Sequence, residues 1–133
     1  MLLEPRIITL FCGMGTHTKS IYHFMHKYAV RKICIILSKA NAPEIERRIK
    51  ELKEEIQKKT EELDHDVQIV YIAVPHTDFV SSFQTIYDAL KKEKNNDVIV
   101  DITGGRKIVS YALHYAYSYF RRSFQGISKL VYF

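Results

Sequence analysis

Two glycine-containing segments hold the residues whose types and spacing could bind phosphate. The first is CGMGTHT, residues 12–18, which follows an apolar run and enters a helical pattern. Gly13 and Gly15 permit close approach of the backbone to a ligand, and free N–H groups at a helix start attract phosphate. The alternative reading is a tight strand-to-helix turn that binds nothing.

The second segment is DITGGRK, residues 101–107, where a buried run ends in an Asp and a Thr, followed by two glycines. Arg106 and Lys107 then open a helix, at the end where the helix dipole disfavours cations. A bound anion would account for their position. The spacing is not GxxxxGK[ST], which excludes the phosphate loop of nucleoside triphosphatases.

Two other nucleotide-related classes fit less well. A dinucleotide fingerprint needs a third glycine at position 18, where Thr18 stands, and an acid after the second apolar run, where Ser38 and Lys39 stand. A nicotinamide-linked reductase is therefore disfavoured. We expect no direct DNA or RNA binding by this chain, because no helix-turn-helix, RNP or zinc pattern is present and the cations cluster at one strand end; such binding is kept only as the less favoured alternative.

Five apolar runs alternate with four helical patterns, and together they must position these segments. The runs span residues 6–11, 32–37, 67–74, 97–102 and 129–133, and the helical patterns span residues 18–28, 43–63, about 79–90 and 106–122. Either Thr77 or Asp78 can cap the third helix. The first, second and fourth runs are nearly continuous in apolar residues, as in parallel strands covered on both faces. We therefore expect an α/β fold: a doubly wound, Rossmann-like, mostly parallel five-stranded sheet with helices on both faces.

Length, composition and charge limit the class of protein. The chain has 133 residues, 47% of them hydrophobic, which predicts a single domain over residues 1–133. Its net charge is +5, and residues 44–64 hold eight acids and six bases, so the rest of the chain carries +7. This distribution suggests an anionic partner.

The remaining expectations concern location, cysteines and aromatic residues. No apolar run approaches a membrane span and the first ten residues do not form a signal peptide, so we expect a cytoplasmic protein without membrane contact. Cys12 and Cys34 lie in apolar runs and predict buried thiols rather than a disulfide or a metal site. Tyr111, Tyr115 and Tyr119 recur every four residues and predict core or a dimer interface.

The segment DITGGRK, preceded by VIV and opening a helix, resembles the signature of the CRISPR-associated Rossmann-fold (CARF) sensor domains, Asp-x-Thr-Gly-Gly-x-Lys or Arg. The glycine loop after a short first strand, the long charged second helix and the phrase HTDFVSSFQTIYDAL at residues 76–90 are similar to that family too. The resemblance spans essentially the whole chain, and residues 101–107 are its specific part. It implies a homodimer that binds cyclic oligoadenylate, most often cyclic tetra-adenylate, across a two-fold axis in type III CRISPR antiviral signalling.

The resemblance also implies roles for residues. Those at the second segment hold phosphates and ribose, Asp101 orients the turn, and the first segment contacts the other side of each nucleotide. The implied ligand-binding residues are Gly13, Met14, Gly15, Thr18, Ser38, His76, Thr77, Thr103, Gly104, Gly105, Arg106 and Lys107. The implied catalytic residues are Lys107, Arg106, Thr16 and His17.

Three functions remain open under the resemblance. The first is a ring nuclease, a phosphodiesterase that needs no metal or cofactor because a ribose 2′-OH attacks the adjacent phosphate while the protein supplies orientation and charge. The second is a protein that sequesters the messenger without cleaving it. The third is the sensor domain of a transcription regulator whose effector lies outside this chain.

Overall fold

The computed structural model describes residues 7–14, 19–39, 42–62, 66–75, 77–105, 107–124 and 128–131. Strands and helices alternate along it as the sequence predicts. The elements are β1 (Ile8–Gly13), α1 (Lys19–Lys27), β2 (Lys32–Ser38), α2 (Ala42–Thr60), β3 (Gln68–Val74), α3 (Phe79–Lys92), β4 (Asp97–Asp101), α4 (Lys107–Ser123) and β5 (Ser128–Val131).

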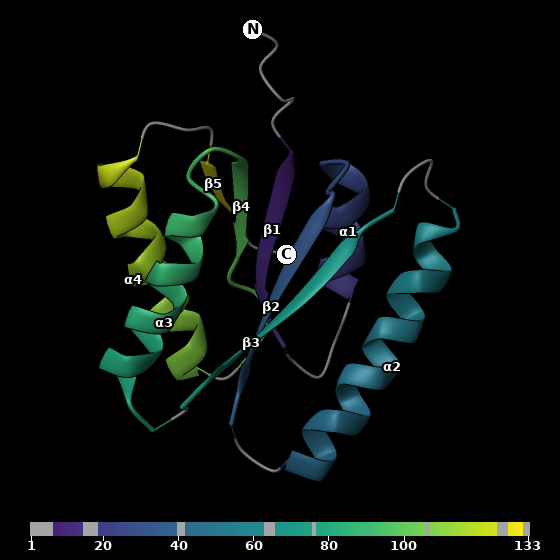
Figure 1. Ribbon diagram of the computed structural model, residues 1–133, viewed down its shortest axis with the longest axis horizontal. Helices are drawn as coiled ribbons and strands as arrows, with labels where there is room; N and C mark the ends of the chain where they lie inside the picture. Colours follow the sequence, from purple (N-terminus) through teal and green to yellow (C-terminus); the bar gives the residue numbers. More distant parts are fainter. Residues whose placement is uncertain are drawn as a thin grey trace, which may run out of the picture.

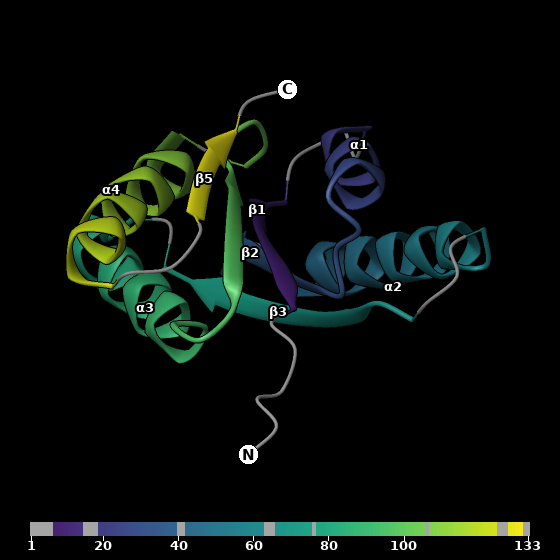
Figure 2. The same cartoon turned by 90° about the horizontal axis from the view of Figure 1, so that it is seen from above.

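The strands form one sheet in the order β3-β2-β1-β4-β5, and every neighbouring pair is parallel. Helices α1 and α2 cover one face, and α3 and α4 cover the other (Figures 1 and 2). The predicted doubly wound Rossmann-like fold is confirmed. The sheet is wholly parallel rather than mostly parallel.

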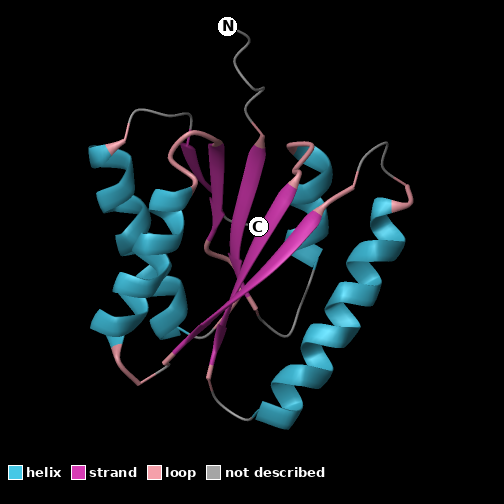
Figure 3. Cartoon of the chain, in the orientation of Figure 1, coloured by secondary structure: helices cyan, strands magenta, loops and turns pink. Residues whose placement is uncertain are grey.

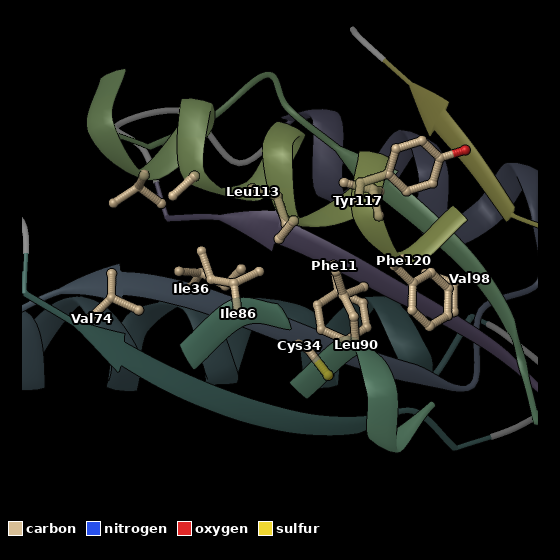
Figure 4. Close-up of a cluster of buried hydrophobic side chains, with 14 residues drawn as sticks. Phe11, Cys34, Ile36, Val74, Ile86, Leu90, Val98, Leu113, Tyr117 and Phe120 are labelled. Atoms are coloured by element: carbon tan, nitrogen blue, oxygen red, sulfur yellow. The ribbon is translucent and has the colours of Figure 1, made fainter. Parts of the chain in front are cut away.

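Two hydrophobic clusters, one on each face, explain the continuous apolar runs. Consecutive side chains of a strand point to opposite faces, and along β1 Leu10 belongs to the cluster under α1 and α2 while Phe11 belongs to the other. Figure 4 shows Phe11 in the second cluster with Leu90 of α3 and Leu113 of α4. A central strand of this sheet therefore has no solvent-facing side, and most of its residues are apolar.

Local chemistry sets the beginning of α3. Of the two candidate caps it is Asp78 that acts: its carboxylate accepts hydrogen bonds from the backbone N–H of Ser81 at 3.2 Å and from the Ser81 hydroxyl at 2.7 Å. The hydrogen bond from the Ser81 hydroxyl lowers the pKa of Asp78 most, and the bond from the Ser81 N–H adds to this. Thr77 is exposed beside it.

The observed end of β1 corrects the sequence-based boundary. The run was predicted to span residues 6–11, but β1 continues to Gly13, while Arg6 lies outside the described residues. The strand is longer because Gly13 still pairs with Ile36 of β2 and Cys12 with Asp101 of β4. Gly13 is therefore the last residue of a strand and not part of a free loop.

The apolar side of α3 is buried to different depths along the helix. Phe79, at its first turn, is 37% exposed, whereas Ile86 and Leu90, further along the helix, are fully buried. Tyr111, Tyr115 and Tyr119 of α4 are also exposed, so they are not part of the core, which was one of the two roles predicted for them. Among the described residues, no helix combines the length and apolar character needed to cross a bilayer.

Both cysteines are buried free thiols, as predicted. Burial raises the pKa of Cys34 to about 12, with smaller opposing effects of the Lys32 and Glu93 charges. Burial also raises the pKa of Cys12, and the charges of Asp101 and Cys34 add to this.

We expect the free energy of unfolding to fall as the pH rises from about 9 towards 12. The folded state keeps the Cys34 thiol protonated, whereas the unfolded chain releases that proton near its ordinary pKa, so the folded state binds more protons and loses stability with rising pH. Urea unfolding of the wild type and Cys34→Ala at pH 8 and pH 10.5 measures this. The variant should lose less stability between these two pH values. An equal loss in both proteins would show that the Cys34 thiol is not responsible.

Candidate ligand site at the carboxyl ends of β1 and β4

The order of the strands places a reversal between β1 and β4. Helix α1 leaves β1 towards one face and α4 leaves β4 towards the other, while the two strands lie side by side with their carboxyl ends towards the lower edge of Figure 3. Ligands of open α/β sheets bind at such a reversal, outside the carboxyl ends of the strands. Both glycine-containing segments start there.

Three glycines bring the two segments into backbone contact. A Cβ atom placed on Gly13 would lie 2.5 Å from the carbonyl oxygen of Gly104 and 3.3 Å from the Cα of Gly105. Gly105 has φ +94°, a conformation that residues with a side chain rarely adopt. The end of β1 thus packs directly on the turn after β4, and only glycine fits the contact at Gly13.

The carboxylate of Asp101 holds that turn by a hydrogen bond. The residue is fully buried, and its Oδ1 accepts a hydrogen bond from the backbone N–H of Thr103 at 2.9 Å. Its Oδ2 is buried without a hydrogen-bond partner among the described residues. This geometry agrees with the orienting role inferred for Asp101.

Two further hydrogen bonds hold the turn, and the sequence patterns did not point to either. The hydroxyl of Ser110, on the first turn of α4, donates to the carbonyl oxygen of Ile102 at 3.0 Å. The backbone N–H of Ile102 donates to Val131 of β5 at 3.2 Å. A serine early in a helix, eight residues after the carbonyl it contacts, has no local signature, so only the folded arrangement reveals its role.

The neighbouring strand ends are fixed in the same way. Beyond β1, the Met14 N–H donates to the carbonyl of Ile36 at 2.8 Å, and beyond β2 the Lys39 N–H donates to Val74 at 2.9 Å. Ser38 is the last residue of β2 and is half-buried. The carboxyl edge from β4 to β3 is therefore an ordered row of backbone ends.

The predicted site residues divide into three groups. Gly13, Gly104 and Gly105 are in contact, and the backbone of Thr103 is tied to Asp101 in the same turn. Met14, Ser38, Thr77 and Lys107 lie at the ends of the adjacent elements, with Lys107 exposed as the first residue of α4. The others lie outside the described residues: Gly15, Thr16, His17, Thr18, His76 and Arg106.

The fold and this edge together define a Rossmann-like domain with a glycine-lined edge at the reversal of strand order. The chain belongs to the family described as the Csa3 CRISPR-associated Rossmann-like domain, whose model matches residues 8–129. This confirms the resemblance to the CRISPR-associated Rossmann-fold domains. A search of curated proteins by sequence finds no match to the chain.

Solved structures with the same fold include those of three proteins. Can2 from Sulfobacillus thermosulfidooxidans, in complex with cyclic tetra-adenylate, aligns with a TM-score of 0.67 at 14% identity over 94% of this chain. Csm6 of Enterococcus italicus, bound to cyclic hexa-2′-fluoro-hexa-dAMP, aligns with a TM-score of 0.67 at 11% identity over 96%. Protein VC1899 from Vibrio cholerae aligns with a TM-score of 0.64 at 9% identity over 85%. The chain spans 31%, 34% and 28% of their respective lengths.

Proposed function

We propose that the protein binds cyclic oligoadenylate, and specifically cyclic tetra-adenylate, at the carboxyl ends of β1 and β4. The observation that carries the proposal is the contact of Gly13 with the Gly104–Gly105 turn, because it unites the two glycine-containing segments at one edge. Membership of a CRISPR-associated family and the cyclic oligoadenylates bound to Can2 and Csm6 support the choice of ligand.

The chemistry of the ligand suits this edge. Cyclic tetra-adenylate carries four phosphodiester charges on one ring, and a two-fold dimer would offer it two copies of each glycine turn and of Lys107. Backbone N–H groups at the start of α4 favour an anion there, and the anion offsets the unfavourable position of Lys107 against the helix dipole. A symmetric ring and a symmetric dimer also match in shape.

The exposed aromatic residues of α3 and α4 supply the dimer surface of this proposal. Tyr111, Tyr115 and Tyr119 are 57%, 57% and 53% exposed, and Phe79 of α3 contacts Tyr115 edge to face with ring centroids 5.7 Å apart. Exposed aromatic patches of this kind are typical of interfaces. The stripe begins one turn after Lys107, so pairing along it would bring two ligand edges together.

A double substitution Tyr115→Arg and Tyr119→Arg is therefore expected to convert the dimer into a monomer. Two arginines facing their copies across a two-fold axis would add like charges and remove aromatic contact area. Sedimentation equilibrium measures the mass. Glu51→Arg with Glu54→Arg, both exposed on α2, is the control and should stay dimeric. A wild-type monomer at high concentration would contradict the dimer.

Lys107→Ala is expected to weaken cyclic tetra-adenylate binding by about 10- to 150-fold, because a hydrogen bond to a charged group contributes about 1.5–3 kcal/mol. The side chain is exposed, so the fold should be unaffected. Titration calorimetry gives the dissociation constants. Lys92→Ala, at the other end of the domain, is the control and should bind as the wild type does. Equal affinity in the two variants would remove Lys107 from the site.

The proposal extends to cleavage of the ring without a metal. The ribose 2′-oxygen attacks the adjacent phosphorus, the bond to the 5′-oxygen breaks, and the departing 5′-oxygen takes up a proton as the 2′-hydroxyl loses one. Lys107 stabilises the charge of the phosphorane in this scheme, with the roles of Arg106, Thr16 and His17 taken from the family resemblance.

Incubation with cyclic tetra-adenylate in the presence of a chelator, followed by chromatography, tests this step. Linear di-adenylate ending in a 2′,3′-cyclic phosphate is the expected product. Intact ring after prolonged incubation with saturating protein would contradict cleavage and leave a sensor or sequestering protein. No binding at all would contradict the proposed function itself.

A further inference from the structure

A polar cavity lies beside the second half of α4, away from the candidate ring site at its start. It has a volume of about 480 Å³ and is lined by His114, Tyr117, Ser118, Arg121, Arg122 and Leu130. The residues come from the last three turns of α4 and from the edge strand β5, which Figure 2 shows beside each other. At 1.5 Å per residue the helix rises about 10 Å from Lys107 to His114 and about 21 Å to Arg121, so the arginines lie well away from the candidate ring site.

The cavity walls are rich in donors for an anion. Arg121 and Arg122 are exposed and contribute two guanidinium groups, and His114 stands two turns earlier on the same helix. None of the described lining residues is an acid. Within the described part of the chain, no recorded ion pair involves either arginine. A guanidinium group donates two parallel hydrogen bonds to the oxygens of one phosphate, so two arginines that line one cavity are typical of a phosphate site.

A buried hydroxyl is aimed into the same cavity. Tyr117 is only 5% exposed, and Figure 4 shows its hydroxyl oxygen leaving the hydrophobic cluster on the side of β5. That oxygen accepts a long hydrogen bond of 3.5 Å from Ser128. An O–H···O hydrogen bond is usually about 2.5–3.0 Å long, so this contact leaves the phenol able to donate to a ligand. A buried polar group without its full complement of partners favours occupation by an acceptor.

The helix explains part of this arrangement but not all of it. Arg121 and Arg122 are stabilised by the negative end of the helix dipole, so their presence alone needs no ligand. The dipole, at about half a charge, offsets only part of the two guanidinium charges. It gives no account of the cavity or of the buried phenol of Tyr117.

We propose that this cavity binds the phosphate group of a small phosphorylated molecule of nucleotide size. Arg121 and Arg122 hold the phosphate oxygens, the Tyr117 hydroxyl donates a further hydrogen bond, and Leu130 supplies an apolar wall for the rest of the molecule. The volume lies within the range of about 300–1,000 Å³ that is usual for small-molecule sites. The proposal is independent of cyclic oligoadenylate binding.

Titration calorimetry with AMP and with inorganic phosphate tests the proposal, in a Lys107→Ala background so that the ring site is weakened. We expect both probes to bind, AMP more tightly. Arg121→Gln with Arg122→Gln should weaken binding at least tenfold, since each charged hydrogen bond contributes about that factor or more. Tyr117→Phe, which keeps the ring and its packing, should weaken binding several-fold. Lys92→Gln with Lys94→Gln removes the same charge elsewhere and should change nothing.

Three results would overturn the proposal. The first is no binding of either probe at millimolar concentration, and the second is an equal loss in the arginine and lysine pairs. The third is a short DNA duplex that binds through Arg121 and Arg122 while AMP does not, which would assign the surface to nucleic acid. Cyclic tetra-adenylate binding by the arginine pair variant, with Lys107 intact, reports on the ring site separately and should equal that of the wild type.

Discussion

Gly13→Ala is expected to abolish cyclic tetra-adenylate binding and to destabilise the domain by about 1–3 kcal/mol, the cost typical of overpacking a close contact. The new methyl group would lie 2.5 Å from the carbonyl oxygen of Gly104, and both atoms belong to or adjoin rigid backbone. Relief requires that the end of β1 or the turn after β4 move. Either movement takes apart the edge at which the phosphates are proposed to bind.

Calorimetric titration and urea unfolding measure the two effects, and Gly105→Ala provides the comparison. A Cβ on Gly105 would meet its neighbours at 3.4 Å and 3.5 Å, ordinary contact distances, so the cost there comes from φ +94° alone. That strain is about 1–2 kcal/mol. We expect weaker binding in both variants and complete loss only for Gly13→Ala. The opposite order would show that the strand contact does not control the site.

Glu93→Ala is expected to lower the free energy of unfolding by about 1–3 kcal/mol, because it leaves a partly buried lysine charge without its partner. The ammonium of Lys32, at the start of β2, forms an ion pair with Glu93, at the end of α3, and their side chains are 23% and 5% exposed. The side chain of Asn96 donates to the other carboxylate oxygen at 2.8 Å. This network ties α3 to the amino edge of the sheet, away from the proposed ligand.

The hydrogen bond to Glu93 raises the pKa of Lys32 above its ordinary value. The contribution of this lysine to the free energy of unfolding is therefore complete below its unfolded pKa of about 10.4. It is lost as the pH rises through the higher pKa of the folded state. Urea unfolding at pH 7 measures the loss in Glu93→Ala. The double variant Lys32→Met with Glu93→Leu should recover much of it, because a buried ion pair can be replaced by apolar residues. A Glu93→Ala variant as stable as the wild type would contradict the assignment.

The order and type of the elements followed from the sequence because the physics is local. A strand covered on both faces is apolar at most positions, and the runs at β1, β2 and β4 show this directly. The exposure of Phe79 was not predictable from its spacing, because the helix period gives a face but not where along the helix the neighbouring element ends. Tyr117 was missed for a related reason: its ring completes the core stripe of α4 while its hydroxyl reaches the cavity beside β5.

The candidate site was only partly predictable. The residue types in both glycine-containing segments indicated phosphate chemistry, but their contact depends on the register of β1 against β4, where Cys12 pairs with Asp101. That register joins residues far apart in the chain, and no spacing within either segment encodes it. The hydrogen bond of Ser110 to Ile102 is non-obvious for the same reason, since it exists only once α4 has docked.

Calorimetric titration of the protein with cyclic tetra-adenylate, without metal, at a temperature where any cleavage is slow, tests the central proposal most directly. The expected result is saturable binding with one ring per two chains, lost in Gly13→Ala and weakened in Lys107→Ala. Absence of binding to folded, dimeric wild-type protein, even at high ring concentration, would contradict the account. One ring per chain would contradict the shared site.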